Sequence, residues 1–256
     1  MKPDSSVALK KRVALITGGG RGIGAATARL ANKKGWSICI NYQSRNDSAE
    51  KLVDEINESG GSAISVKADI SKEADVISLF NTVDKFGKIQ ALINNAGVIA
   101  PQSPLVDVSA DRLHKIFNTN IVGSFLCARE AVKRMSTGRD GHGGSIINVS
   151  SAAARLGSPH EFIDYAASKG AIDTMTIGLS KEIAEEGIRV NAVRPGLIET
   201  EMHLDAGDIN RPQKLKKFIP MKKVGSASDV ANAIVWLMSD EASYVTGALI
   251  DVAGGR

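Results

Sequence analysis

Short apolar runs alternate with segments of helical periodicity along the chain. The first run, residues 13–16, stops at a cluster of glycines, which is typical of a buried strand that ends in a tight turn. Similar runs predict strands at 36–41, 63–67, 91–94, 145–149, 189–193 and 248–252. Helical patterns fall between them, at 25–34, 48–59, 74–86, 110–134 (one long helix or a broken pair), 163–186 and 228–239. Strands that alternate with helices imply βαβ units and a parallel sheet covered on both faces.

The alternation therefore predicts an α/β fold, a doubly wound Rossmann-type parallel sheet of about seven strands with helices on both faces. Because the chain shows no internal repeat or linker, we expect residues 12–256 to form a single domain, preceded by a flexible tail at 1–11. The polar stretch 199–224 is the one long segment without a regular pattern. Loops of that length in compact domains usually have a function, so we expect a substrate loop there.

Composition and charge narrow the class of protein. Of the 256 residues, 43% are hydrophobic and 23% charged, as in soluble globular proteins. The net charge of +4 is too modest to favour nucleic-acid binding and fits an anionic cofactor or substrate equally well. No run approaches the ~18–20 apolar residues that cross a membrane, and residues 1–12 do not resemble a signal peptide. Cys39 and Cys127 show no metal or disulfide spacing, so we expect a cytoplasmic protein.

A glycine-rich turn follows the first predicted strand and leads directly into a helix. Its spacing is Gly-x-x-x-Gly-x-Gly, through Gly18, Gly22 and Gly24, and the strict GxGxxG pattern does not fit. Glycines let the backbone approach a pyrophosphate, and the helix N-terminus supplies amide donors and a partial positive charge. The turn therefore predicts a dinucleotide site, with a glycine turn that binds no ligand as the alternative.

The end of the second predicted strand indicates which nicotinamide cofactor is preferred. NAD sites hold Asp or Glu here for the ribose 2′-hydroxyl, whereas residues 41–45 are Asn-Tyr-Gln-Ser-Arg and no acid occurs before Asp47. Ser44, Arg45 and Arg21 of the glycine turn could instead bind a 2′-phosphate. We expect NADP(H) to be preferred. If NAD(H) is used, the two arginines are solvated surface residues.

Tyr165 and Lys169 lie four residues apart, on one face of a predicted helix. Ser150 and Ser151 close the fifth predicted strand, at the edge where open α/β sheets bind ligands. A free tyrosine has a pKa of ~10, and a nearby ammonium lowers it by favouring the phenolate. We therefore expect Lys169 to tune Tyr165 as general acid in carbonyl reduction and general base in alcohol oxidation. Ser151 would orient the substrate oxygen.

Taken together, these motifs resemble the short-chain dehydrogenase/reductase family over nearly the whole chain. The chain is similar to glucose-1-dehydrogenase-like and 3-oxoacyl-carrier-protein-reductase-like members of that family. The matching pieces, in order, are residues 17–24, Asp69-Ile70, Asn94-Asn95-Ala96-Gly97, Asn120, Ser151, Tyr165 with Lys169, and Arg194-Pro195-Gly196 with Ile198 and Thr200. So many ordered motifs at family-like spacing are very specific.

The resemblance implies a role for each matching piece. Lys169 would also hold the nicotinamide ribose, and Asn120 would anchor a water in a proton relay unless its amide merely satisfies local backbone groups. Residues 69–70 would flank the adenine, 94–97 would line the ribose and nicotinamide side, and 195–200 would hold the carboxamide. The expected cofactor contacts are Gly18, Arg21, Gly22, Ile23, Gly24, Ser44, Arg45, Asp69, Ile70, Asn94, Ala96, Gly97, Tyr165, Lys169, Pro195, Gly196, Ile198 and Thr200.

One position departs from the family pattern. The family usually places its serine thirteen residues before the tyrosine, where this chain has Ala152, whereas Ser151 is fourteen and Ser150 fifteen residues before Tyr165. We interpret this as a one-residue insertion in the loop 155–164 that leaves Ser151 catalytic, with Ser150 as the alternative. The same loop and the stretch 199–224 are expected to select the substrate.

The expected reaction is hydride transfer between the nicotinamide and a carbonyl or secondary alcohol of a small molecule. A 3-oxoacyl-carrier-protein reductase and a non-catalytic dinucleotide-binding regulator stay as alternatives, although a regulator has no need of the Tyr165 and Lys169 pair. We expect no metal, because His203, Asp205 and Asp208 are irregularly spaced. The resemblance also implies a homotetramer joined through the helices around 110–135 and 163–186 and the C-terminal strand.

Overall fold

A parallel sheet of seven strands, in the order β3-β2-β1-β4-β5-β6-β9, forms the centre of the molecule. The computed structural model describes residues 12–256. The strand order reverses between β1 and β4, and ligands of open α/β sheets bind at such a point. The predicted doubly wound Rossmann sheet is therefore confirmed. The predicted flexible tail at 1–11 lies outside the described residues.

The strands and helices have the following bounds. The strands of the sheet are β1 Arg12–Ile16, β2 Ser37–Tyr42, β3 Ala63–Lys67, β4 Lys88–Asn94, β5 Gly144–Val149, β6 Ile188–Pro195 and β9 Leu249–Val252. The longer helices are α1 Gly22–Lys33, α2 Asn46–Glu58, α3 Glu73–Phe86, α4 Ala110–Phe117, α5 Gly123–Met135, α7 Ile163–Glu182 and α10 Ala227–Met238. Short elements are α6 Ala153–Leu156, α8 Met202–Asp205, α9 Arg211–Leu215 and the strand pair β7 Ile198–Glu199 and β8 Gly225–Ser226.

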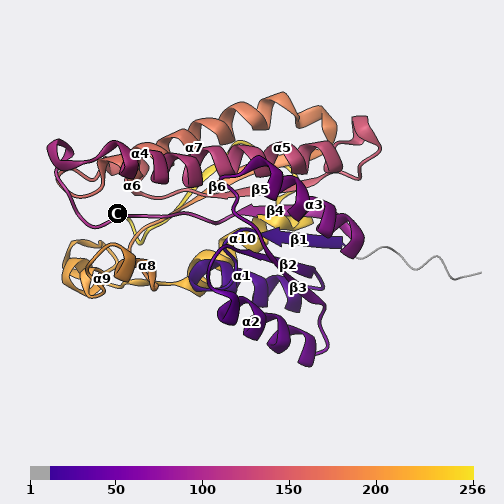
Figure 1. The fold of residues 1–256 in the computed structure, drawn as a ribbon, viewed down its shortest axis with the longest axis horizontal. Helices are drawn as coiled ribbons and strands as arrows, with labels where there is room; N and C mark the ends of the chain where they lie inside the picture. Colours follow the sequence, from indigo (N-terminus) through magenta and orange to yellow (C-terminus); the bar gives the residue numbers. More distant parts are fainter. Residues whose placement is uncertain (1–11) are drawn as a thin grey trace, which may run out of the picture.

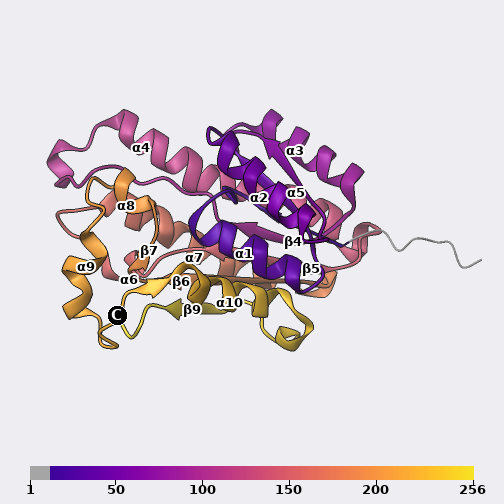
Figure 2. The same ribbon diagram turned by 90° about the horizontal axis from the view of Figure 1, so that it is seen from below.

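Two apolar layers cover the sheet, one on each face. The layer with α1, α2 and α10 packs on Ala14 and Ile16 of β1, and the layer with α3 and α5 packs on Val13 and Leu15. Figures 1 and 2 show α1, α2 and α10 on the face opposite α3 and α5. Because successive strand residues point to opposite faces, a strand buried on both sides is an uninterrupted apolar run. This explains why the runs in the sequence identify the strands.

The structure corrects several predicted boundaries. The region 110–134 is a broken pair, in which a π-helical turn at Asn118–Val122 joins α4 to α5. Helix α1 begins at Gly22, three residues earlier than predicted, because the glycine turn itself supplies its first residues. Helix α7 ends at Glu182 and not at 186, since a 3-10 turn and left-handed Gly187 (φ 72°) follow. The stretch 199–224 contains α8 and α9, so it is more ordered than predicted.

The remaining general features concern membranes and thiols. No helix within residues 12–256 is long and apolar enough to cross a membrane. Cys39 and Cys127 are buried in the apolar layer with α3 and α5, and burial raises the pKa of each thiol to about 12. Both side chains are therefore small core residues.

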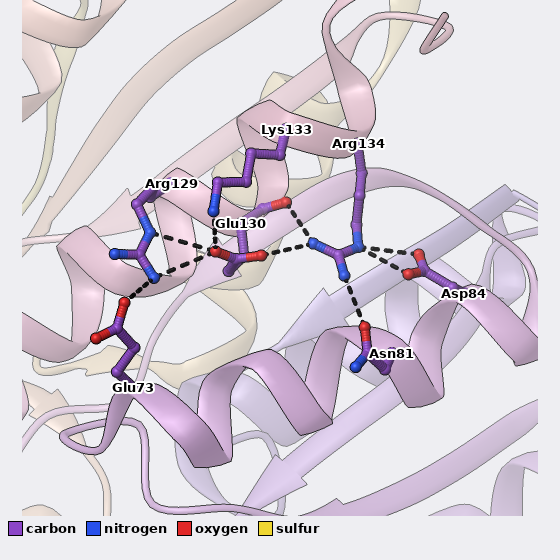
Figure 3. A network of polar contacts seen from close by, with 7 residues as sticks. All are labelled: Glu73, Asn81, Asp84, Arg129, Glu130, Lys133 and Arg134. Atoms are coloured by element: carbon purple, nitrogen blue, oxygen red, sulfur yellow. Dashed lines mark hydrogen bonds and ion pairs between the residues drawn. The ribbon is translucent and has the colours of Figure 1, made fainter. Parts of the chain in front are cut away.

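A network of charged side chains joins α3 to α5 (Figure 3). At its centre, the carboxylate of Glu130, whose side chain is 5% exposed, bonds Lys133 at 2.7 Å and Arg134 at 2.8 Å. Arg134 continues to Asp84 of α3 at 2.9 Å. Burial by itself would raise the pKa of Glu130, but the bonds to Lys133 and Arg134 outweigh it and hold that pKa below its usual value. Ionised Glu130 therefore stabilises the packing of α3 against α5.

We expect Glu130→Gln to lower the free energy of unfolding by roughly 1–3 kcal/mol near pH 7, because a largely buried set of charged hydrogen bonds loses its central carboxylate. The pKa of Glu130 is lowered in the folded state, so its contribution is complete above the unfolded value of about 4.3 and is lost as pH falls through the folded pKa. Urea unfolding at several pH values measures the difference from wild type, which should shrink in acid. Glu50→Gln, at an exposed position of α2, is the control. A difference that does not change with pH would contradict the assignment.

Candidate active site

Two adjoining pockets open at the carboxyl ends of the strands. The first, here called the glycine-turn groove, is lined by the glycine turn and by the residues that follow β2, β3 and β4. The second, here called the Tyr165 pocket, is lined by the end of β5, the start of α7 and the segment after β6. Ile23, Asn95, Thr200 and Met202 line both, so the two pockets form one continuous site.

Contacts from β4 fix the shape of the glycine turn. Asn95 Nδ2 donates to the carbonyl oxygens of Thr17 at 2.9 Å and Gly18 at 3.1 Å, and Thr17 Oγ1 accepts from Asn95 N at 3.0 Å. Gly18 (φ 59°) and Gly22 (φ 52°) have left-handed backbones that favour glycine. A Cβ on Gly24 would lie 2.7 Å from Asn95 Nδ2. The glycine spacing in the sequence therefore reflects real steric requirements.

The N-terminus of α1 opens from this turn, and within residues 12–256 no side chain caps it. Its N-cap residue, Arg21, makes no side-chain cap, and the first turn contains no acidic residue. The amide groups and the positive end of the helix dipole are thus free for an anion. Together with the left-handed glycines, they fit the pyrophosphate of a dinucleotide.

The outer part of the glycine-turn groove is lined by Tyr42, Gln43, Ser44 and Arg45, as the sequence predicts for a 2′-phosphate site. Ser44 and Arg45 are exposed. Arg21 also lines the groove, but its Nη2 is bound to Asp205 of α8 at 2.6 Å. The groove therefore contains both predicted guanidinium groups, and one of them already has a carboxylate partner in α8.

The remaining predicted cofactor residues divide into two groups. Asp69, Ile70, Ala96 and Gly97 line the glycine-turn groove, and Pro195, Gly196, Ile198 and Thr200 line the Tyr165 pocket. Gly24 packs beneath the turn and lines neither pocket.

The structure does not bring Asn94 to the ribose side, where we expected it. Asn94 is the last residue of β4, and its side chain is buried, donating to Ser124 O at 3.2 Å and to Asn148 Oδ1 at 3.0 Å. Asn95, the first residue beyond the strand, lines both pockets instead. Asn95 belongs to the segment 94–97 that was expected at this side, although it is not among the individually predicted contacts. The alternation of side chains at the end of β4 was the available signal.

Tyr165 and Lys169 are buried on the same face of α7, and both line the Tyr165 pocket. Ser151 lies near enough to Tyr165 to lower the pKa of its phenol, and Ser151 Oγ accepts from Ala153 N at 3.1 Å. Ser150 Oγ donates instead to the main-chain oxygen of Lys169 at 3.2 Å. Of the two serines, Ser151 is therefore the one that faces the phenol.

The expected lowering of the Tyr165 pKa is not found in this structure. Burial raises the pKa of Tyr165 to about 12, although Ser151 opposes it. Burial also lowers the pKa of Lys169 to about 8, against the charge of Asp173. Lys169 Nζ donates to Val149 O at 2.7 Å and lies 5.6 Å from the centre of the Tyr165 ring. Desolvation of the phenolate is therefore the largest influence on the pKa of Tyr165, and the phenol is protonated at neutral pH.

Asn120 lies in the π-helical turn and braces three segments. Its Nδ2 donates to Val98 O at 3.0 Å and Ser168 Oγ at 3.0 Å, and its Oδ1 accepts from Val98 N at 2.8 Å. The side chain therefore ties the segment after β4 to α7, beside Lys169. Anchoring of a water by Asn120 stays a prediction.

The walls of the Tyr165 pocket come from the two segments expected to select the substrate. Leu156 and Phe162 belong to the first, and Met202 and Ala206 to the second. His203, Asp205 and Asp208 each have a different partner. His203 Nε2 is hydrogen-bonded to Ile198 O at 2.9 Å, Asp205 forms an ion pair with Arg21, and Asp208 forms an ion pair with Lys214 at 2.8 Å. Within the described part of the chain, no group of three or more His, Cys, Asp or Glu side chains could hold a metal ion.

Comparison with known proteins agrees with this geometry. Residues 18–256 match the family model described as enoyl-(acyl carrier protein) reductase. The chain belongs to the short-chain dehydrogenase/reductase family. Among members of this family, it is 51% identical to the Escherichia coli protein named uncharacterized oxidoreductase YgfF, over 95% of this chain and 99% of that one. It is 37% identical to glucose 1-dehydrogenase 2 of Bacillus subtilis, over 96% and 95% of the two chains.

A solved structure extends the comparison to three dimensions. A short-chain dehydrogenase from Burkholderia cenocepacia, in complex with NADP, superposes with a TM-score of 0.87 at 30% identity, over 96% of this chain and 98% of that one. The short-chain dehydrogenase/reductase described here is therefore an oxidoreductase that uses a nicotinamide dinucleotide.

Proposed function

We propose that this short-chain dehydrogenase/reductase is an NADP(H)-dependent carbonyl reductase, with Tyr165 as proton donor. The observation that carries the proposal is the buried pair Tyr165 and Lys169, which lines one pocket together with Ser151, and this pocket shares residues with the glycine-turn groove. A protonated phenol at this position can give its proton to a carbonyl oxygen, and Ser151 can hold that oxygen by a second hydrogen bond. A regulator without turnover has no use for this buried pair.

Other residues of the site bind the cofactor, stabilise charge and exclude water. Bound nicotinamide supplies the hydride in reduction and accepts it in oxidation. Lys169, fixed to Val149 O, places positive charge beneath Tyr165 and stabilises the phenolate that remains after proton transfer. Gly97 lies beside Lys169 Nζ and Asn120, where a Cβ would be 3.4 Å from the amine, so a ribose can approach closely. The apolar walls exclude water from the reacting atoms.

The preference for NADP(H) is proposed from charge at the outer groove. Among residues 41–45, which end and follow β2, there is no carboxylate, while Ser44 and Arg45 line the groove there. Arg21 adds a second guanidinium once a 2′-phosphate competes with Asp205 for it.

Removal of the Tyr165 hydroxyl tests the proton-donor assignment. We expect Tyr165→Phe to lower kcat by at least roughly a hundredfold, because general acid catalysis contributes about that much or more. Turnover is followed by loss of reduced-nicotinamide absorbance, and thermal unfolding confirms that the variant is folded. Tyr244→Phe, at a fully exposed tyrosine, is the matched control and should behave as wild type. Near-normal turnover by folded Tyr165→Phe would show that another group gives the proton.

A second measurement tests the cofactor proposal. Wild type should bind NADPH more tightly than NADH. Arg45→Ala should reduce that preference roughly tenfold, because one charged hydrogen bond contributes about that factor to affinity. Calorimetric titration with both cofactors measures the ratio, with Arg139→Ala, at an exposed arginine elsewhere, as control. If NADH binds as tightly as NADPH and Arg45→Ala changes neither affinity, the assignment of the 2′-phosphate site is wrong.

We also propose a cytoplasmic homotetramer. The reduced, buried cysteines suit a reducing compartment. Around α5 and α7, the apolar side chains of Val122, Phe125 and Ile177 are 42%, 49% and 40% exposed, as expected of residues that pack against another copy. Sedimentation equilibrium should give four times the mass of one chain, and Phe125→Asp should give smaller species. A monomeric wild type would exclude this assembly.

A further inference from the structure

The charged residues that line the Tyr165 pocket are all basic. Among the described residues, its lining contains Lys169, Arg211, Arg256 and His203 but no aspartate or glutamate side chain. Burial lowers the pKa of His203, which leaves that ring neutral near pH 7, so the charges are those of the lysine and the two arginines. Glu161, outside the lining, pairs with Arg211, and the excess of cations in the lining itself still attracts anionic ligands.

Arg211 is held at a fixed place near the Tyr165 phenol. It forms an ion pair with Glu161, and its guanidinium lies 5.3 Å from the centre of the Phe162 ring. Phe162 in turn packs against Tyr165 and Ala206 in one apolar cluster. Arg211 is therefore separated from Tyr165 by a single aromatic side chain, and Glu161, which does not line the pocket, fixes its orientation.

Arg256 is a partly exposed charge that lines the pocket. Across residues 12–256, the structure shows no hydrogen bond or ion pair to its guanidinium, although the residue is partly buried. Its main-chain oxygen accepts from Arg155 Nη2 at 2.8 Å, which holds this end of the chain in place. Burial lowers the pKa of Arg256, and the nearby charge of Arg211 lowers it further while Glu161 opposes it. A guanidinium at a pocket wall without a protein partner can bind an anionic group brought by a ligand.

We propose that the substrate carries a carboxylate or phosphate group, which Arg256 and Arg211 bind while its carbonyl lies at Tyr165. The inference rests on the proposed carbonyl reduction and adds the chemical class of the substrate. The phosphates of the cofactor do not account for these arginines, because neither lines the glycine-turn groove. A carbonyl compound with an acidic group beyond an apolar segment would match both the walls and the charges of the pocket.

Matched pairs of ketones test the proposal. One pair is 4-oxopentanoate and its methyl ester, and the other is dihydroxyacetone phosphate and dihydroxyacetone. We expect the anionic member of at least one pair to have the higher kcat/KM, and the pair that shows it identifies carboxylate or phosphate as the group bound. Arg256→Gln should reduce that advantage roughly tenfold to a hundredfold, and Arg256→Lys should keep part of it. Arg139→Gln, at an exposed arginine away from the pocket, should keep all of it.

Two results would overturn the inference while leaving carbonyl reduction intact. One is a preference for the neutral ketone in both pairs, and the other is an equal loss for both members of a pair in Arg256→Gln. If no ketone is turned over with either cofactor, the proposed function fails, and binding decides the inference separately. Calorimetry in the presence of NADP should then show 4-oxopentanoate or dihydroxyacetone phosphate bound more tightly by wild type than by Arg256→Gln. Equal binding of both anions would exclude the site.

Discussion

The hydrogen bonds between Thr17 and Asn95 join the ends of β1 and β4 at the point where the strand order reverses. Both pockets depend on this contact. Thr17 is fully buried, so its bonds are shielded from water, and they fix where the glycine turn leaves the sheet. The glycine turn then places the N-terminus of α1 at the glycine-turn groove, and Asn95 lines both pockets. The glycine-turn groove and the Tyr165 pocket are therefore held at fixed positions relative to each other.

In the Tyr165 pocket, burial affects the pKa values of the catalytic side chains more than charge pairs do. Tyr165 and Lys169 are both taken out of water, and each is shifted toward its neutral form. A protonated phenol suits carbonyl reduction, which needs a proton donor near pH 7. Oxidation needs the phenolate, and the positive charge of an oxidised nicotinamide ring would favour it. Arg211 and Arg256 line the same pocket as Tyr165, where guanidinium groups can bind an anionic group of a ligand.

Much of the fold and the order of the site could be predicted from the sequence, because they depend on local chemistry. Apolar runs buried on both faces identified the strands, and the glycine spacing identified a turn that the structure shows to be sterically required. The failures concern facts that only tertiary structure decides. Asn94 and Asn95 are chemically identical, and the end of β4 decides which one reaches the groove. Helical spacing placed Lys169 near Tyr165, but it could not show that burial would raise the pKa of Tyr165. Arg21 and Asp205, 184 residues apart, gave no sign of pairing, and the same holds for Arg211 and Arg256 on one pocket.

Direct hydride transfer is the central claim, and isotopic labelling measures it without reference to any one residue. The protein is incubated with a ketone and with NADPH that carries deuterium at one or the other face of nicotinamide C4, and the product alcohol is examined by mass spectrometry and NMR. Deuterium at the carbinol carbon from one labelled form only, with a slower rate for that form, is the expected result. Consumption of NADPH that leaves the alcohol unlabelled by both forms, or tight cofactor binding without any alcohol, would contradict it.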